Sequence, residues 1–248
     1  MSAADLPELS GDWAFFLDVD GTLLEIAARP DGVRVDAAVR QLLDEVRAAA
    51  GGALALISGR TVADLDALFA PLVLPAAGQH GVERRDAAGR IHRHAFDEAP
   101  LRRVAAQLAA FARERGLLFE NKGHALALHY RLAPAQAGAA RAEMERAARE
   151  LGQDFDVLAG KSVFELKPCG RDKGVAVEEY LAEAPFAGRT PVFVGDDVTD
   201  EFGFGVVNRL AGHSIKVGEG ASAARWRLEA PAAVRAWIAA GLAHAARC

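Results

Sequence analysis

The chain has 248 residues, of which 51% are hydrophobic and 25% charged, and its formal net charge is −5. This length allows a large core, either in one domain or in a domain that carries a sizeable insertion. The acidic balance argues against nucleic acid or an anionic membrane surface as a partner, and no apolar run approaches the ~18 residues of a membrane span.

The start of the chain, MSAADLPELSGDW, has no basic segment followed by an apolar one, which argues against a secretory signal. The two cysteines, Cys169 and Cys248, lie outside any metal-ligand spacing and predict no disulfide framework. We therefore expect a cytoplasmic protein that works as a monomer, with neither a membrane nor a nucleic acid as its partner.

The first part of the chain alternates between strand and helix patterns. The apolar run WAFFLDVD (13–20) ends in acid and has the pattern of a parallel strand covered on both faces. A helix is predicted over residues 35–50, because its apolar residues recur on one face ahead of a Gly-Gly stop. A second buried strand, ALALIS (53–58), is followed by a helix that Thr61 and Asp64 would open as a capping box.

The same alternation resumes late in the chain. It predicts a helix over 170–184, a strand over 190–201 that again ends in acid, a short strand over 213–218 and a terminal helix over 231–246. Polar residues thus gather where the predicted strands end. In open α/β sheets, that edge is where ligands bind.

Between these two parts the pattern changes. From about Ala99 to Leu166 it indicates a helix, two strands, a second helix and two more strands. Such a block forms its own small antiparallel sheet, so we predict a second domain inserted into the first. The predicted boundaries are residues 1–98 and 167–248 for the core and 99–166 for a cap over an active site.

Carboxylates follow two of the core strands. Asp18 and Asp20 are two positions apart and share a face if the chain stays extended, while Asp196 and Asp197 end another strand. That many carboxylates in one crevice repel each other unless a cation or a proton offsets the charge. Mg²⁺ suits such a site, because it takes oxygen ligands and binds substrate phosphate.

Each of these features, taken singly, also fits a purely structural role. An acidic residue such as Asp200 is favourable in the first turn of a helix, and Ser58 can be a turn hydroxyl. Lys173 is different, because the helix dipole disfavours a cation in the first turn by ~0.3–1 kcal/mol. A phosphate bound at that helix start would supply the missing anion.

Together, these features resemble the haloacid dehalogenase (HAD) superfamily, whose signature is DxDGT, then Ser or Thr, then Lys, then an acidic DD or GDxxxD. The corresponding segments here are DVDGT (18–22), Ser58, Lys173 and GDDVTD (195–200). The resemblance implies an α/β fold with a Rossmann-like core around a central parallel sheet. It also implies that the inserted α+β block, of order α-β-β-α-β-β, is a cap.

Within that superfamily the chain resembles the trehalose-6-phosphate phosphatases from Phe15 to about Trp237. The similar segments are LDVDGTLLEI, ISGR, GQHG, ENKGHALALHYR, GKSVFELKPCGRDKG and VFVGDDVTDE. The cap segments carry the substrate identification. The reaction implied is the Mg²⁺-dependent hydrolysis of trehalose 6-phosphate to trehalose and phosphate through an aspartyl-phosphate.

The resemblance also implies roles for individual residues. Asp18 would be the nucleophile, and Asp20 the general acid and then the base. Mg²⁺ would be held by Asp18, Asp196 and the main-chain carbonyl of Asp20. Lys173 would add positive charge beside the phosphoryl group. The expected phosphate-binding residues are Gly21, Thr22, Ser58, Gly59 and Lys173.

Asp197 and Asp200 are expected to orient the metal ligands or to support Lys173 rather than to bind the metal. The sugar is expected to be recognised by polar side chains that would go unpaired with a wrong ligand. Three such pairs share a strand face if their segments are extended, namely Lys161 with Glu165, His129 with Arg131, and Glu120 with Lys122. For the cap residues, a solvated sheet face is the alternative. The candidates are Arg60, His80, Glu120, Lys122, His129, Arg131, Lys161 and Glu165.

Three other functions compete with this one. Sucrose-phosphate and mannosylphosphoglycerate phosphatases share the core, so a different sugar phosphate is the first alternative. A non-catalytic sugar-phosphate sensor would be expected to lose Asp18, Asp20 or Lys173, and all three are present. A phosphate-accepting signalling domain also uses an acidic strand end, but it would not explain the inserted block.

Overall fold

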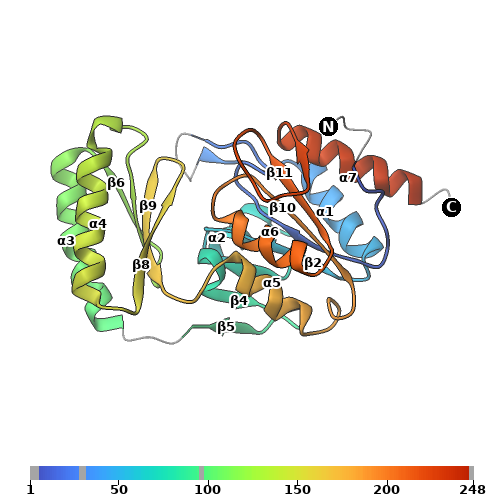
Figure 1. Cartoon of the computed structure of the whole chain (residues 1–248), viewed down its shortest axis with the longest axis horizontal. Coiled ribbons are helices and arrows are strands. Elements are labelled where there is room, and N and C mark those ends of the chain that lie inside the picture. Colours follow the sequence, from blue (N-terminus) through green and yellow to red (C-terminus); the bar gives the residue numbers. More distant parts are fainter. Residues whose placement is uncertain (1–5, 28–31, 95–97, 246–248) are drawn as a thin grey trace. The chain divides into compact units, whose positions relative to one another are not determined.

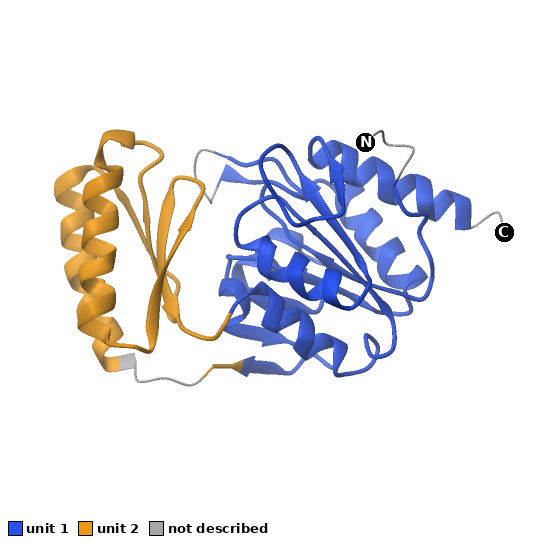
Figure 2. Cartoon of the chain, viewed as in Figure 1, with its two compact units in different colours: residues 1–92, 172–248 blue, residues 93–171 orange. Residues whose placement is uncertain are grey.

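The computed structural model describes residues 6–27, 32–94 and 98–245. Within these ranges the chain divides into two compact units, residues 1–92 with 172–248, and residues 93–171 (Figure 2). The boundaries predicted at 98/99 and 166/167 lie a few residues inside the second unit. The first five residues of the chain, residue 246 of the predicted terminal helix and Cys248 lie outside the described residues.

The first unit contains an eight-stranded sheet in the order β12-β11-β10-β1-β2-β3-β4-β5. The strands from β12 to β3 are parallel to their neighbours, and β4 is antiparallel to β3. The strands are β1 (Trp13–Leu17), β2 (Leu54–Ile57), β3 (Ala76–Gly78), β4 (Glu83–Arg85), β5 (Ile91–Arg93), β10 (Thr190–Gly195), β11 (His213–Val217) and β12 (Trp226–Leu228).

Helices cover both faces of this sheet (Figure 1). The crossovers β1-α1-β2 and β10-α6-β11 run in opposite directions across it, and parallel crossovers are right-handed, so α1 and α6 lie on opposite faces. Helix α7 packs beside α1, and α5 packs beside α6. The helices of this unit are α1 (Ala37–Ala49), α2 (Val62–Phe69), α5 (Lys173–Leu181), α6 (Asp200–Arg209) and α7 (Pro231–Ala245).

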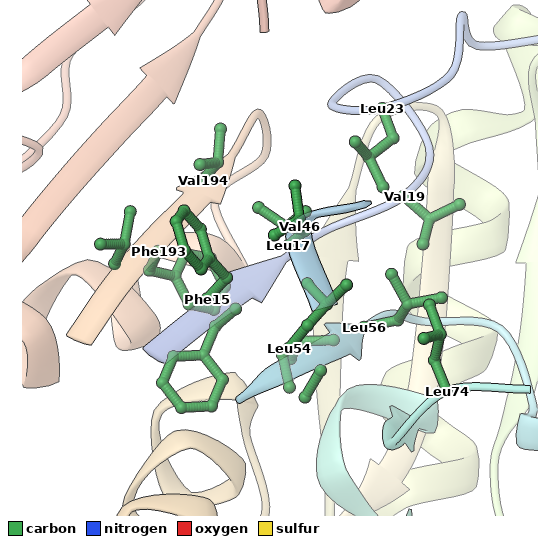
Figure 3. Close-up of a cluster of buried hydrophobic side chains, with 14 of the residues drawn as sticks. Phe15, Leu17, Val19, Leu23, Val46, Leu54, Leu56, Leu74, Phe193 and Val194 are labelled. Atoms are coloured by element: carbon green, nitrogen blue, oxygen red, sulfur yellow. The ribbon is translucent and has the colours of Figure 1, made fainter. Parts of the chain in front are cut away.

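The core of the first unit follows from apolar residues on both sides of the central strands. All five residues of β1 and all four of β2 are buried. Figure 3 shows Phe15 and Leu17 of β1 in one cluster with Leu54 of β2 and Phe193 of β10. Burying each such side chain contributes about 1.5–3 kcal/mol, so the covered strands anchor the sheet on which the site is built.

The second unit is an antiparallel sheet of order β6-β7-β9-β8 with two helices on one face (Figure 2). Its apolar face packs against both helices, with Leu128 and Leu166 from the sheet, Leu108 from α3 and Met144 from α4. The predicted α-β-β-α-β-β order is confirmed. The elements are α3 (Glu98–Arg115), β6 (Leu118–Asn121), β7 (Leu126–His129), α4 (Ala137–Leu151), β8 (Phe155–Gly160) and β9 (Val163–Pro168).

Local signals determine several boundaries. Helix α1 begins after Asp36, whose carboxylate accepts from the amide of Val39, and ends before two glycines of positive φ. The capping box of Thr61 and Asp64 at α2 is confirmed. The strand predicted over 13–20 ends earlier, at Leu17. No helix among the described residues is both long and apolar enough to cross a membrane.

Four short strands of the sheet, β3, β4, β5 and β12, have no counterpart in the sequence prediction. Strand β4 shows why, because its residues Glu83, Arg84 and Arg85 are all buried although all are charged. Glu83 accepts from the amide of Val62, and Arg85 pairs with Asp66 at 2.7 Å. Apolar periodicity cannot signal a strand whose burial depends on ion pairs.

Candidate active site

The carboxyl ends of three adjacent parallel strands meet at one edge of the sheet in the first unit. Asp18 follows β1, Ser58 follows β2 and Asp196 follows β10. Asp18 continues the pairing for one residue, since its amide donates to the carbonyl of Val194 at 3.0 Å. The predicted site residues of three distant segments are therefore neighbours, as expected for parallel strands.

Lys173, the first residue of α5, lies between two of these acids. Its ammonium donates to Oδ1 of Asp18 at 2.8 Å and to Oδ1 of Asp200 at 2.6 Å. All three side chains are almost fully buried, with exposures of 3%, 6% and 0% for Lys173, Asp18 and Asp200. The sequence predicted that Lys173 needs an anion at the start of this helix. The carboxylates of Asp18 and Asp200 supply part of that negative charge.

Asp200 uses both of its oxygens. While Oδ1 accepts from Lys173, Oδ2 accepts from the amides of Asp196 at 2.9 Å and Asp197 at 2.8 Å. Gly195 makes room for this arrangement, because a Cβ there would lie 2.3 Å from Cγ of Asp200. The structure thus places Asp200 as a support for Lys173 and for the segment that carries Asp196.

Asp197 was expected to orient the metal ligands or to support Lys173, and the first of these two roles stays a prediction. Its carboxylate accepts from the amide of Val198 at 2.8 Å, and the described structure contains no hydrogen bond between Asp197 and Lys173. Of the two acids proposed to support the lysine, it is therefore Asp200 that contacts it. Asp197 instead contributes its main-chain amide to Asp200.

Gly21 allows the acidic segments to approach each other closely. Its φ is +89°, and a Cβ at this position would lie 2.2 Å from Oδ2 of Asp196. The turn is closed by a hydrogen bond from the amide of Gly21 to the carbonyl of Leu24 at 2.7 Å. Only glycine combines this backbone conformation with the missing side chain, so the segment after β1 can pack against Asp196.

Burial dominates the electrostatics of the cluster. Desolvation raises the pKa of Asp18 to about 6, although Lys173 beside it acts in the opposite direction. Burial also raises the pKa of Asp200. For Lys173, burial alone would lower the pKa, but Asp18 and Asp200 outweigh it and raise the pKa above that of a free lysine. The lysine is therefore a fixed positive charge among these carboxylates.

Asp20 is held by Arg60, which comes from the segment after β2. The guanidinium donates to both oxygens of Asp20, from Nε at 2.6 Å and from Nη2 at 2.7 Å. This two-point contact is the geometry in which arginine binds a carboxylate most strongly. Arg60 was predicted to contact sugar, and in the structure its guanidinium lies on the predicted general acid.

The predicted phosphate-binding hydroxyls lie beside these groups. Thr22 is fully buried, and its Oγ1 has no hydrogen-bond partner among the described residues. Ser58 is buried as well, and its Oγ accepts from the amide of Arg60 at 3.2 Å. A buried hydroxyl without a partner carries a free-energy penalty, which a ligand oxygen can remove.

His80 packs directly against Gly59. A Cβ at Gly59 would lie 2.8 Å from Nε2 of the imidazole, so only a residue without a side chain fits there. His80 and its neighbour Gln79 both have positive φ, at 56° and 49°, which is uncommon for residues with side chains. The amide of His80 donates to the carbonyl of Ser58 at 3.0 Å, which fixes this turn beneath the loop after β2.

The residues at the strand edge fit a hard divalent cation. Asp18, Asp196 and Asp200 each offer a carboxylate oxygen, and these atoms lie within 4.8 Å of one another. Because Lys173 and two amides already occupy both oxygens of Asp200, Asp18 and Asp196 are the better ligands. A donor set made only of oxygens suits Mg²⁺.

Four of the predicted sugar-binding residues of the second unit pair on one face of its sheet, Lys122 with Glu165 and His129 with Glu120. Glu120 and Glu165 lie in register on either side of Ala127, so their side chains point to the face opposite the helices. Lys122 donates to both oxygens of Glu165 at 3.3 Å. His129 bonds Glu120 at 2.9 Å; burial acts to raise the pKa of Glu120, but His129 and Lys122 outweigh it and lower the pKa.

Two of the expected strand pairs do not occur. Lys161 and Arg131 would share strand faces with Glu165 and His129 only in extended segments, but both lie in turns outside β9 and β7. The adjacent Ser162 has a φ of 65°, which marks the tight turn between β8 and β9. The two turns meet instead, since Arg131 donates to the carbonyl of Lys161 at 3.1 Å.

Lys216 belongs to the site region but was not among the predicted residues. It lies near the end of β11, is only 5% exposed, and donates from its ammonium to the main-chain carbonyl of Asp196. The available signal was a lysine between two apolar residues in a short strand, HSIKV. Such a residue has to bury its charge beside a partner, and the neighbouring strand end supplies one.

The fold is shared with solved structures of other proteins. A haloacid dehalogenase-like hydrolase from B. subtilis superposes with a TM-score of 0.64 at 14% identity, covering 91% of this chain and 99% of that one. The C-terminal domain of trehalose-6-phosphate phosphatase from C. albicans superposes with a TM-score of 0.84 at 22% identity, covering 94% and 93%. These likenesses confirm the predicted Rossmann-like core with an inserted cap.

The sequence comparison is more specific. A sequence model of the trehalose-phosphatase family matches residues 16–232. The trehalose-6-phosphate phosphatase of Escherichia coli K12 is 46% identical over 235 residues, which are 94% of this chain and 88% of that protein. The chain belongs to the trehalose-phosphatase family.

Proposed function

We propose that this chain is a Mg²⁺-dependent phosphatase that hydrolyses trehalose 6-phosphate to trehalose and phosphate. Its family and its similarity to the E. coli enzyme support the reaction. The observation that carries the proposal is the buried contact of Lys173 with Asp18, at the edge where Asp196 also lies. In this cluster the Lys173 ammonium holds Asp18 in place, and the carboxylates of Asp18 and Asp196 offer oxygen ligands for a metal ion.

Asp18 is the nucleophile of this proposal. One of its carboxylate oxygens attacks phosphorus, the bond between phosphorus and the sugar oxygen breaks, and the electron pair leaves with the sugar oxygen. Lys173 donates a hydrogen bond to Oδ1 of Asp18 and keeps the carboxylate oriented. Its positive charge also stabilises the negative charge that develops on the phosphoryl group during the attack. Water then attacks the aspartyl-phosphate and regenerates Asp18.

Asp20 moves the protons. It protonates the departing sugar oxygen in the first step and takes a proton from water in the second. The two-point contact with Arg60 fixes the orientation of the Asp20 carboxyl group. We therefore assign Arg60 to the control of Asp20 in addition to the predicted sugar contact.

The phosphoryl group is bound by donors around the strand edge. The Thr22 hydroxyl, which has no hydrogen-bond partner among the described residues, and the Ser58 hydroxyl supply hydrogen bonds, together with main-chain amides around Gly21 and Gly59. Asp18, Asp196 and the main-chain carbonyl of Asp20 would hold Mg²⁺. When bound, this ion offsets the repulsion between nucleophile and phosphate and orients the phosphoryl oxygens.

The sugar is recognised by polar groups on the second unit. The pairs Glu120 with His129 and Lys122 with Glu165 present donors and acceptors to hydroxyls. A buried polar group left unpaired by a wrong sugar makes that sugar bind more weakly, which is the basis of the proposed selectivity. Arg131, Lys161 and His80 complete the set of proposed contacts.

The substrate is a small molecule, and we propose that the protein acts on it in the cytoplasm as a monomer. The net charge of −5 supports the absence of nucleic acid and anionic membranes among its partners. The described residues form both units within one chain. Size-exclusion chromatography with light scattering would test the monomer directly.

A panel of sugar phosphates tests the substrate. Phosphate released from trehalose 6-phosphate is expected to exceed that from sucrose 6-phosphate, glucose 6-phosphate and mannosylphosphoglycerate in kcat/KM. Equal or better rates on another member of the panel would assign the chain to a different sugar-phosphate phosphatase. Binding without any phosphate release would indicate a sensor.

The nucleophile is tested by Asp18→Asn. This change keeps the shape of the side chain and is expected to abolish phosphate release, because an amide cannot form the aspartyl-phosphate. Asp66→Asn, at an acid that pairs with Arg85 away from the strand edge, is the matched control and should retain activity. Phosphate release by Asp18→Asn at the wild-type rate would refute the covalent mechanism.

A further inference from the structure

We propose that Lys216 is a positioning residue that holds Asp196 in the orientation needed for Mg²⁺ binding, an inference that rests on the proposed function. Strand β11 lies next to β10 in the sheet, and Lys216 is in register with Gly195, the residue before Asp196. Its ammonium donates to the main-chain carbonyl of Asp196. The lysine thus reaches the acidic segment from the strand beside it.

The contact fixes one end of a single peptide group. The carbonyl of Asp196 and the amide of Asp197 belong to the same planar unit, whose two ends point in opposite directions. Lys216 binds the carbonyl end, and Oδ2 of Asp200 accepts from the amide end at 2.8 Å. Since the amide of Asp196 also donates to Asp200, at 2.9 Å, the backbone of Asp196 is held on both sides.

The side chain of Asp196 follows from this fixed backbone. Its carboxylate lies against Gly21, where a Cβ would be 2.2 Å from Oδ2, so there is little room for another orientation. It also lies within 4.8 Å of an oxygen of Asp18. A rotated peptide after Asp196 would therefore turn one of the two proposed carboxylate ligands of the metal away from the other.

A buried lysine is an unusual means of filling space in a strand. Lys216 is 5% exposed, and burying an ammonium is unfavourable unless hydrogen bonds offset the lost hydration. Ile215 and Val217, which point to the opposite face of the sheet, are apolar and buried, whereas Lys216 shares its face with Ser214, a buried polar residue that also has a hydrogen-bond partner. The charged donor is thus explained by what it binds, the carbonyl of a metal-ligand residue.

The test measures Mg²⁺ affinity by isothermal titration calorimetry with MgCl₂ alone, without substrate. Lys216→Met keeps most of the side-chain volume but removes the donor, and it is expected to weaken Mg²⁺ binding by about 10- to 100-fold, as found for groups that orient metal ligands. Lys216→Arg restores a donor and should recover most of the affinity. Circular dichroism checks that each variant is folded.

The matched control is Lys167→Met in the second unit. Lys167 is also a buried lysine, 8% exposed, whose ammonium donates to a main-chain carbonyl, that of Arg171. Removing it should leave Mg²⁺ affinity unchanged. If both methionine variants lose affinity equally, the effect is a general cost of removing a buried lysine and the inference is wrong.

The remaining outcomes are also decisive. Wild-type affinity in folded Lys216→Met would refute the positioning role while leaving the proposed function intact. Absence of Mg²⁺ binding by the wild-type chain would instead refute the metal dependence of the proposed function, and this inference with it. If Lys216→Met does not fold, Lys216→Gln, whose amide is too short to replace the ammonium, takes its place with the same expected loss.

Discussion

At the scale of single residues, the strand edge depends on groups that fit only because a neighbour lacks a side chain. Gly21 and Gly195 leave the space that the carboxylates of Asp196 and Asp200 occupy. Lys173 then joins Asp18 to Asp200 in a buried ion cluster. The arrangement of the charged groups therefore depends on the space that these glycines leave as much as on the charged residues themselves.

Gly21→Ala is expected to disturb both stability and activity. The left-handed φ of +89° alone costs about 1–2 kcal/mol for a residue with a Cβ. The new methyl group would also displace the carboxylate of Asp196. A misplacement of about 1 Å in a group at the active site can lower kcat by ~100-fold. Urea unfolding and phosphate release from trehalose 6-phosphate measure the two effects.

Gly89→Ala separates these contributions. Gly89 has a similar φ of +83°, but a Cβ there would meet nothing within 4 Å. It should lose about 1–2 kcal/mol of stability and keep wild-type activity. If Gly21→Ala and Gly89→Ala gave the same stability and the same activity, the close approach of Gly21 to Asp196 would make no contribution to activity.

At the scale of elements, α5 is attached to the sheet by the charged strand β4. Arg84 of β4 lies over the ring of Tyr180 at 4.7 Å and pairs with Glu179 at 3.2 Å and with Glu183. The hydroxyl of Tyr180 donates in turn to the carbonyl of Arg85 at 2.7 Å. Because Lys173 is the first residue of α5, this attachment also determines where the lysine ammonium lies.

Arg84→Met is expected to lower the free energy of unfolding by about 1.5–3 kcal/mol, because it removes hydrogen bonds to charged groups from a buried guanidinium. Arg90→Met is the matched control in the following turn. Arg90 pairs with Asp86, but its side chain is 73% exposed, so its removal should change stability by about 0–1 kcal/mol. Similar losses in urea unfolding for both variants would contradict a specific role of Arg84.

The same elements show what the sequence could and could not predict. The buried strands β1, β2 and β10 were predictable because a short, continuous apolar run bounded by polar residues is typical of a strand covered on both faces. Strand β4 was not, since its burial depends on ion partners that are distant in sequence. The pairing of Lys161 with Glu165 was predicted only for an extended segment, and the turn at Ser162 shows that this condition is not met.

The site followed the same rule. Asp18, Asp196 and Lys173 could be predicted because strand ends and a helix start restrict where such residues go. The contact of Arg60 with Asp20 joins the segments that follow β2 and β1, and that of Lys216 with Asp196 joins β11 to the segment that follows β10. No local pattern specifies such partners, so only the assembled sheet reveals them.

At the scale of the whole molecule, Mg²⁺ is expected to stabilise the folded chain. A ligand at 100 times its Kd adds about 2.7 kcal/mol, which for a chain of this size raises Tm by roughly 5–10 °C. Asp196→Asn should lose most of this shift, because it removes a proposed ligand. Differential scanning calorimetry with MgCl₂ and with EDTA, at matched ionic strength, measures it.

Asp66→Asn is the control for general charge effects and should keep the full Mg²⁺ shift. Asp66 pairs with Arg85, outside the acidic strand edge. A shift that survives in Asp196→Asn would place the ion elsewhere in the molecule. A shift lost in both variants would show that it reports overall charge rather than a defined site.

The central position of β10 has a consequence for the growing polypeptide on the ribosome. Strand β1 pairs with β2 on one side and with β10 on the other, and β10 is made only after the whole insertion. Until Thr190–Gly195 emerges, the apolar segment WAFFL has one open edge, which can pair with other chains. Nascent-chain protection should therefore matter most for this protein during the interval in which the insertion is being translated.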